Sequence, residues 1–497
     1  MRNGPTVVSS VGMVGVAVVF LIRAGFHFDY TPDDTYIYLQ YARNVVQHHE
    51  VAFNSGEPSY GVTSPLWLAI ISVSGWSGLD PYAAGKIIDM LAAVGAIVAL
   101  YALQRLFVPD RLVALLTAAA FSTHVWFLRW TGSGMETSLA TLLSILFLYA
   151  IMKRRFLMAA AVTGLLVLTR PEAAIVIGLS LLCMLALHKE VRSWGVFALF
   201  TGGVFLVLFP WYAYAYRTFG TILPNTALAK SGLGFSMEGA ISTLVDIGAT
   251  LGASDGISLV VLAVAVGAHF VPRRARTMKD WRRLKPFVVP VVWVASLPLL
   301  YVFTSTNVVS RYLLMICPVL VLLAFAVPLQ LVQVESNRRV SRVLSVLLTM
   351  LVVIYNVSLY ELRVRPQIDA FARGMDECFI YIGNWLKENT PKDASVLVGD
   401  VGAIGYYSER RICDAAGLIS SELLPLARMG YNAELLKHEK EYREYCQAGY
   451  VIESSRILNP PRPPHLEPLV TRTIFGLRMT SKDPVYYTVL KVVGSSE

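Results

Sequence analysis

Long apolar runs separated by short polar clusters fill roughly the first 360 residues of the chain. A helix that crosses a hydrocarbon core needs about 20 mostly apolar residues. Windows of this kind begin near Val7, Pro81, Leu112, Met135, Phe156, Ala173, Trp194, Gly256, Pro286, Val309 and Val340. The pattern therefore predicts a polytopic α-helical membrane protein with about eleven spans.

The apolar stretch at residues 64–78 decides the orientation of everything that follows it. It is short and contains Pro65 together with several Ser and Gly residues. If it lies along or dips into the membrane without crossing, the basic clusters at 105–111, 153–155, 188–192, 273–285 and 338–342 all fall on one side. Because Lys and Arg accumulate in cytoplasmic loops, we expect a non-crossing segment in a plasma-membrane protein with a cytoplasmic N-terminus.

This orientation places two long loops, 26–64 and 217–255, on the outer face. Apolar residues recur at helical spacing over 237–251, which predicts an interfacial helix there. Arg2 precedes an apolar stretch without a small-residue cleavage site, so we expect the first helix to remain uncleaved.

From residue 362 onward the chain turns polar. Apolar spacing predicts helices near 371–389 and around 419–447, and strands at 395–399, 450–453 and 486–493. The expected organisation is a transmembrane module at 1–361, followed by a small extracytoplasmic α/β domain at 362–497.

Composition supports a membrane protein. Of the 497 residues 55% are hydrophobic and 15% charged, and the mean hydropathy is +0.55. The net charge of +9 comes from clusters between apolar runs, so it indicates topology rather than nucleic-acid binding.

The five cysteines have no metal-binding spacing. Cys183 and Cys317 lie within apolar runs, where a thiol usually packs as a small hydrophobe. Cys378, Cys413 and Cys446 lie in the polar part, which allows one disulfide if that part is outside the cytoplasm.

Most of the unusual polar residues of the membrane module fall on the expected outer side. The predicted span 156–169 is only about 21 Å long, so Arg170 should lie below the outer surface. A charge at that depth needs a wet cavity or a partner, and Glu172 is near in sequence. A structural ion pair that caps the helix turn is the alternative.

Asp33 and Asp34 follow Pro32 directly after the first predicted span. They are either solvated loop charges, N-capping groups for an amphipathic helix at 36–46, or reactive carboxylates. A carboxylate at the edge of a membrane cavity suits a general base acting on a sugar hydroxyl. Basic residues nearby would then stabilise a leaving phosphate.

Three further polar positions have structural explanations. Arg129 beside Trp130 is typical of an interfacial anchor. Lys86 and Asp89 have the spacing of an intrahelical pair. His124 has no second ligand at helical spacing, which favours a hydrogen-bonded histidine over a metal ligand.

The segment Asp33-Asp34-Thr35-Tyr36-Ile37 resembles the aspartate motif of the GT-C superfamily of polyprenyl-phosphate-sugar glycosyltransferases. Further segments in the same order resemble one bacterial subgroup, which includes the terminal arabinofuranosyltransferases of mycobacterial cell walls. These segments are Asn54-Ser55-Gly56-Glu57, 60–64, Gly134-Met135-Glu136-Thr137, Arg170-Pro171-Glu172, Pro224-Asn225-Thr226 with Lys230, Arg311-Tyr312 and 399–407.

The resemblance implies transfer of a sugar, arabinofuranose being one candidate, with inversion from a polyprenyl-phosphate donor to an envelope glycan or lipid. Asp33 would deprotonate the acceptor, and Asp34 would share or orient that role. The expected phosphate-binding residues are Lys230, Arg170, Arg311 and Arg129. The expected sugar- or acceptor-binding residues are Glu57, Glu136, Glu172 and Asn225. A divalent cation at the two aspartates stays open.

The sequence departs from some relatives, which place a Lys in the first outer loop near the phosphate, because 57–67 contains neither Lys nor Arg. Gly399, Gly402 and Gly405 do not have the spacing of a dinucleotide fingerprint. Tight turns are one interpretation, and acceptor binding or shielding of the site is the other.

Two rival functions follow from the same residues. A transporter or flippase of lipid-linked sugars would place charges at mid-membrane in two related halves, whereas these charges collect at one face. A non-catalytic scaffold for envelope assembly would carry its function in the C-terminal domain. Loss of activity on changing Asp33 would reject both.

Overall fold

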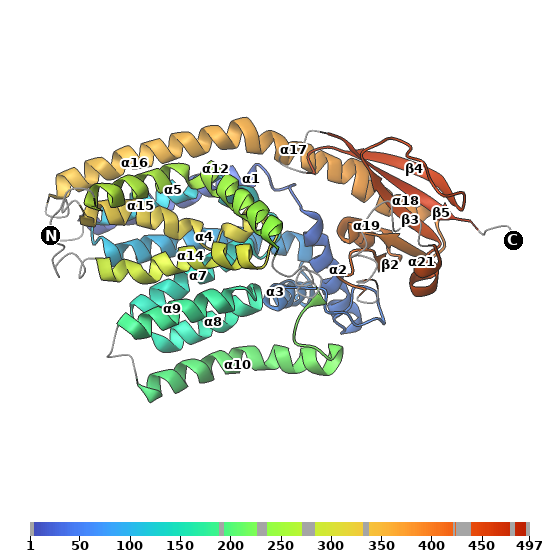
Figure 1. Cartoon of the computed structure of the whole chain (residues 1–497), viewed down its shortest axis with the longest axis horizontal. Coiled ribbons are helices and arrows are strands. Elements are labelled where there is room, and N and C mark those ends of the chain that lie inside the picture. The colour runs from blue at the N-terminus through green and yellow to red at the C-terminus, as the bar shows by residue number, and fades with distance from the viewer. Residues whose placement is uncertain are drawn as a thin grey trace.

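The computed structural model describes residues 4–187, 193–225, 236–270, 284–331, 337–420, 423, 439–477 and 483–493. A bundle of helices forms one end of the molecule, and a smaller domain containing a sheet forms the other (Figure 1). This arrangement confirms a mostly helical protein with a small C-terminal α/β part.

Helices of the bundle run roughly along the long axis of the molecule (Figure 1). They are α1 (Gly4–Gly25), α4 (Pro81–Phe107), α5 (Arg111–Ser122), α6 (Val125–Trp130), α7 (Thr137–Met152), α8 (Phe156–Thr169), α9 (Ala173–Leu187), α10 (Trp194–Phe219), α12 (Met237–Phe270), α14 (Val288–Phe303), α15 (Cys317–Leu331) and α16 (Arg338–Leu359). Several begin at a capping side chain. Asp80 accepts hydrogen bonds from two amides at the start of α4, and Asp110 does so for α5.

Five described helices are long and apolar enough to cross a membrane by length and composition. These are Pro81–Phe107, Trp194–Phe219, Met237–Ala268, Lys285–Phe303 and the helical run Arg338–Asn389. Shorter apolar helices accompany them, including α8, whose bounds agree with the short span expected at 156–169. These helices indicate an integral membrane protein, whereas the number of spans and the side of each loop stay predictions.

Two shorter helices lie where the bundle meets the C-terminal domain (Figure 1). These are α2 (Asp33–His48) and α3 (Pro65–Trp76). The hydroxyl of Ser64 caps α3 by accepting a hydrogen bond from the Trp67 amide. At about 18 Å, α3 is shorter than a hydrocarbon core of about 30 Å, and its expected non-crossing position stays a prediction.

Three expectations about the outer connections are corrected. The helix expected at 237–251 and the span expected near Gly256 form one continuous helix, α12. The expected loop at 217–255 is correspondingly shorter, because α10 extends to Phe219 and α12 begins at Met237. The span expected from Val309 begins at Cys317, after the 3-10 turn η3 (Ser310–Leu313).

One long helical run connects the bundle to the C-terminal domain along the upper edge of Figure 1. It continues from α16 through η5 (Tyr360–Val364), α17 (Arg365–Gly374), η6 (Met375–Ile380) and α18 (Tyr381–Asn389). The expected boundary between residues 361 and 362 therefore lies inside a helix.

The C-terminal domain contains a five-stranded sheet of order β2-β1-β3-β5-β4. Its strands are β1 (Ser395–Val398), β2 (Arg411–Asp414), β3 (Tyr450–Ser455), β4 (Leu466–Ile474) and β5 (Val485–Val492), accompanied by α19 (Val401–Ser408) and α21 (Glu439–Cys446). β1 pairs in parallel with β2 and β3, and β5 is antiparallel to β3 and β4. The sequence pattern missed β2 and β4, and most of the helix expected at 419–447 lies outside the described residues.

Polar contacts fix the C-terminal domain on the loop that follows α2. The amide side chain of Asn54 donates to the Ile412 carbonyl (2.8 Å) and accepts from the Ile412 amide (2.9 Å). A disulfide joins Cys413 on β2 to Cys446 at the end of α21, as the sequence allowed.

Candidate active site

Asp33 and Asp34 occupy the first turn of α2, between the bundle and the C-terminal domain (Figure 1). Pro32 stands at the N-cap in an extended conformation, and no side chain caps this helix. The N-capping explanation for the two carboxylates is therefore wrong. Both are oriented toward other parts of the molecule.

The Asp33 carboxylate accepts hydrogen bonds from two backbone amides of α19. The Gly402 amide donates to Oδ2 (2.9 Å), and the Ala403 amide donates to Oδ1 (2.7 Å). A Cβ atom at Gly402 would lie 2.0 Å from the Asp33 carbonyl oxygen, so only glycine permits this approach. The turns expected at 402 and 405 are corrected, because both glycines lie in α19.

Burial and the nearby Asp400 carboxylate raise the pKa of Asp33 to about 7, although the two amides favour its charged form. Asp34 adds a smaller effect in the same direction as Asp400. A carboxylate with a pKa near neutrality suits proton abstraction at physiological pH.

Asp34 forms an ion pair with the guanidinium of Arg311 in η3. The Asp34 side chain is 44% exposed, whereas that of Arg311 is 12% exposed. The guanidinium of Arg311 also lies 5.1 Å from the Trp130 ring and 5.5 Å from the Tyr312 ring. Trp130 is held in turn by a hydrogen bond from its indole N–H to Ser310 (2.9 Å).

A second guanidinium lies against the same Tyr312 ring. Arg170, which follows α8, is 5.3 Å from the centre of this ring. Its main partner is Glu136 (3.1 Å), and Glu172 lies slightly further away (3.5 Å). Glu172 also accepts a hydrogen bond from the Tyr301 hydroxyl (3.2 Å). The ion pair expected between Arg170 and Glu172 is therefore one half of a larger cluster.

Buried polar atoms of this cluster lack hydrogen bonds within the described part of the chain. They are Arg311 Nε and Glu136 Oε2, whereas Arg170 Nη2 is paired with Glu136 Oε1 (3.1 Å). Buried donors and acceptors normally have partners. The geometry therefore provides places for a polar ligand that carries negative charge and hydroxyl groups.

Tyr38 is a member of this site that the sequence analysis missed. It lies four residues after Asp34, on the same face of α2. The Tyr38 hydroxyl interacts electrostatically with the charged groups of Glu136, Arg170 and Asp34. Its hydroxyl bonds with Thr63 (3.2 Å) and accepts from the Ser64 amide (3.1 Å). The spacing of four from Asp34 was the available signal.

The described contacts of Arg129 are with residues outside the Arg170–Glu136 ion pair. Its guanidinium donates to Gln367 and lies near the rings of Tyr30 (5.4 Å) and Trp130 (5.7 Å). Arg129 and Trp130 are both buried, so the interfacial-anchor explanation does not hold.

Three other expected residues are not brought to this cluster by the described contacts. Glu57 forms an ion pair with Arg411 (2.6 Å) at the contact with the C-terminal domain. Asn225 is buried, and its backbone N–H donates to the Tyr60 carbonyl (2.8 Å). Lys230 lies outside the described residues.

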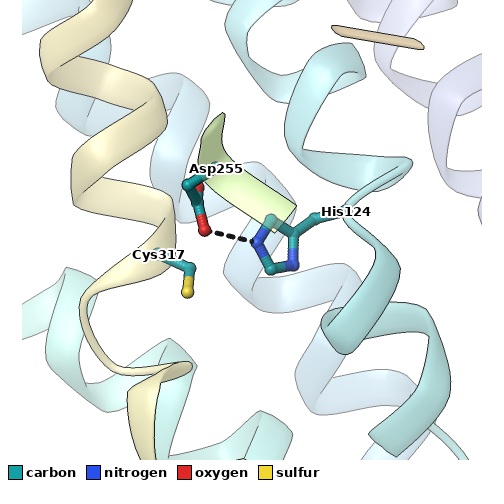
Figure 2. A group of neighbouring side chains, drawn as sticks. All are labelled: His124, Asp255 and Cys317. Atoms are coloured by element: carbon teal, nitrogen blue, oxygen red, sulfur yellow. Dashed lines mark hydrogen bonds and ion pairs between the residues drawn. The ribbon is translucent and has the colours of Figure 1, made fainter. Parts of the chain in front are cut away.

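A second polar cluster lies inside the bundle (Figure 2). It consists of His124 at the start of α6, Asp255 on α12 and Cys317 at the start of α15. His124 Nδ1 accepts from the Phe127 amide (3.3 Å), so Nε2 carries the proton and donates to Asp255 (3.0 Å). The Cys317 thiol donates to the Leu313 carbonyl (3.2 Å). These bonds explain the cluster structurally.

In the described part of the chain, this is the one group of three metal-ligating side chains whose ligand atoms lie close together. Asp33 and Asp34 instead have separate partners, the α19 amides and Arg311. A cation held by the two aspartates stays a prediction, and the arrangement described here does not favour it.

The overall arrangement is similar to that of two solved structures. ArnT from Cupriavidus metallidurans, bound to undecaprenyl phosphate, matches with a TM-score of 0.59 and 13% identity over 98% of each chain. The oligosaccharyltransferase AglB from Archaeoglobus fulgidus, in complex with an inhibitory peptide and a dolichol-phosphate, matches with a TM-score of 0.57 and 15% identity. That match covers 89% of this chain and 69% of AglB. The chain shares the fold of these two proteins, as its resemblance to the GT-C superfamily predicts.

A curated protein also matches part of this chain in sequence. The terminal β-(1→2)-arabinofuranosyltransferase of Mycobacterium tuberculosis is 30% identical over 224 residues, which cover 41% of this chain. The match spans about a third of that relative's length, 35%. A family described as a domain of unknown function (DUF8728) matches residues 368–476, within the C-terminal part.

Proposed function

We propose that this GT-C protein is an inverting glycosyltransferase, which moves a sugar from a polyprenyl-phosphate donor to a hydroxyl of an envelope glycan or lipid. One observation carries the proposal. The two guanidinium groups of Arg170 and Arg311 flank Tyr312 beside Asp34, and the buried Nε–H of Arg311 has no described acceptor.

Asp33 is the proposed general base. Each carboxylate oxygen has two acceptor positions, so the two α19 amides leave Asp33 able to accept a proton. The acceptor hydroxyl would lose its proton to Asp33 as its oxygen attacks the anomeric carbon. The bond between that carbon and the phosphate oxygen breaks, and the electron pair leaves with the lipid phosphate.

Arg311 and Arg170 are the proposed phosphate ligands. Negative charge grows on the phosphate as the bond breaks, and fixed guanidinium groups stabilise this charge most when water is excluded. Asp34 holds Arg311 in place before the donor binds. Lys230 and Arg129 stay candidates for the same role.

Acidic residues around Arg170 are the proposed sugar ligands. Glu136 is buried and has an oxygen without a described hydrogen bond, which suits a sugar hydroxyl. Glu172 and Tyr38 border the same cluster. Glu57 and Asn225, which the described contacts place elsewhere, are candidates for binding a longer acceptor.

We place the reaction on the outer face of the plasma membrane, with the C-terminal domain outside. The disulfide between Cys413 and Cys446 supports this side, because such bonds persist in oxidising compartments. The curated relative supports arabinofuranose as the first sugar to test.

The test uses full-length protein in mild detergent with a synthetic short-chain polyprenyl-phosphate arabinofuranose and matched donors carrying other pentoses and hexoses. Acceptors are oligosaccharide fragments of envelope glycans. We expect release of lipid phosphate that depends on the acceptor, with a product anomer opposite to the donor anomer. Asp33→Asn should abolish release and enrich a copurified sugar-bearing lipid in native mass spectra. A product that retains the donor anomer, or full activity of Asp33→Asn, would overturn the proposal.

A further inference from the structure

The strongest unexplained contact joins the proposed base to a helix that lies 369 residues away in sequence. The Asp33 carboxylate does not bond to its own helix. It accepts one amide on each oxygen from the first turn of α19. These amides have no partners within their own helix, because the first N–H groups of any α-helix lack a preceding carbonyl. The helix dipole adds to the attraction for a negative charge.

The two helices also contact each other beyond this turn. Arg43, on α2, donates to the Tyr406 carbonyl near the end of α19 (3.0 Å), and its guanidinium lies 3.8 Å from the centre of the Tyr406 ring. Gly402 allows the two backbones to meet, since any Cβ there would collide with Asp33. α19 is therefore held against α2 at both of its ends.

Charged groups around Asp33 come from several elements. Asp34 lies next to it on α2 and is neutralised by Arg311. Asp400 precedes α19 and accepts a hydrogen bond from Tyr487 on β5 (2.6 Å). The α19 amides are thus the direct donors to Asp33, opposed by the Asp400 carboxylate.

We infer that α19 is a positioning element of the catalytic site, whose Gly402 and Ala403 amides orient the Asp33 carboxylate and keep it ionised for catalysis. The inference rests on the proposed role of Asp33 as the base. It assigns the C-terminal domain a part in the reaction itself, in addition to any role in binding the acceptor.

The simpler explanation is that the contact only docks the domain. Docking has its own contacts, such as the paired hydrogen bonds between Asn54 and Ile412. A pure docking role predicts that losing either set of contacts has the same effect at every pH. A positioning role predicts a pH-dependent defect for the α19 amides alone.

Ala403→Pro removes one donor to Asp33 without removing an intrahelical hydrogen bond, because proline is tolerated in the first turn of a helix. Val401→Pro is the matched control, since it changes the same turn but not a donor to Asp33. Asn54→Ala is the docking control. Thermal unfolding of each full-length variant shows whether the fold is retained.

The sign of the effect follows from the hydrogen bond. The amide stabilises the ionised carboxylate, so its loss raises the pKa of Asp33. A hydrogen bond to a charged group changes an equilibrium by roughly tenfold or more. For Ala403→Pro we expect the acid limb of the pH profile of kcat/KM, where activity falls as Asp33 is protonated, to move to higher pH by about one unit. The rate relative to parent should fall about fivefold at pH 7 and recover by about pH 9.

Asp400→Asn should have the opposite effect. It removes the negative charge that opposes ionisation of Asp33, so the acid limb should move to lower pH. Val401→Pro and Asn54→Ala should leave the limb at its parent position.

The assay uses the polyprenyl-phosphate arabinofuranose donor, or whichever donor of the panel the parent turns over. An Ala403→Pro limb that coincides with the parent, or a rate loss equal at all pH values, would refute the positioning role. A parent enzyme that turns over no donor would instead count against the proposed function.

Discussion

The buried ion pair of Arg170 with Glu136 allows a stability effect to be separated from a catalytic one. Their side chains are 9% and 2% exposed, so each charge is largely removed from water. Replacing Arg170 with Met leaves Glu136 buried opposite an apolar side chain. Breaking such a pair by removing one partner typically costs about 3–5 kcal/mol. Glu172 remains nearby and adds a second negative charge to the unbalanced cluster.

The double variant Arg170→Met/Glu136→Gln removes both charges of the pair. Replacing a whole buried pair with neutral groups of similar size is often close to neutral for stability. We therefore expect the double variant to recover at least about 2 kcal/mol relative to the sum of the single variants. In thermal unfolding, Arg170→Met should lower Tm by roughly 3–5 °C, and the double variant should regain much of that loss.

The assay is intrinsic fluorescence during heating in mild detergent at one fixed scan rate, since unfolding of such proteins is often irreversible. Lipid-phosphate release is measured on the same samples. If Arg170 binds the donor phosphate, the double variant regains stability but releases lipid phosphate more slowly than Glu136→Gln alone. Additive losses of stability would refute the buried-pair reasoning, and restored turnover would remove Arg170 from the phosphate site.

Three further perturbations test other parts of the structure. Lys86→Met should lower both Tm and activity, because the Lys86 ammonium donates to the Tyr30 and Gly132 carbonyls. Losing such buried hydrogen bonds costs about 1–3 kcal/mol each, and a thermal scan and a rate assay measure the two effects. Cys413→Ser/Cys446→Ser opens a loop with a sequence separation of 33 and should cost about 3–4 kcal/mol, measured as a lower Tm that matches the reduced parent. Arg311→Lys keeps the charge but loses the forked donor, so it should slow lipid-phosphate release more than tenfold. The companion variant Asp34→Asn should instead lower Tm, because the buried guanidinium loses its carboxylate.

Local patterns in the sequence predicted the elements that depend on local chemistry. The short helix α8 and the buried strand β1 follow directly from runs of apolar residues with polar ends. The expected collection of charges was also informative. Asp34, Arg311, Arg170 and Glu136 do form one cluster, since each lies at the end of a helix or in the short turn η3.

Contacts between distant segments left no such local signal. The spacing of the tail glycines suggested turns, yet Gly402 belongs to a helix and owes its identity to Asp33 rather than to its own φ angle. Lys86 and Asp89 have helical spacing, but both also bind the loop around Gly132, one through its carbonyl and the other through its amide. Long-range partners of this kind are set by tertiary packing, which sequence periodicity does not encode.

Helical geometry explains how two adjacent aspartates acquire different roles. Successive residues on an α-helix are rotated by about 100° around its axis, so Asp33 and Asp34 face different directions from one turn of α2. Asp33 faces α19 and receives neutral backbone donors, which orient it while leaving acceptor positions free. Asp34 faces η3 and forms an ion pair with Arg311, so its carboxylate holds the cation in place. A reaction that needs both a free base and a fixed cation is therefore expected at the first turn of α2, where the bundle and the C-terminal domain meet.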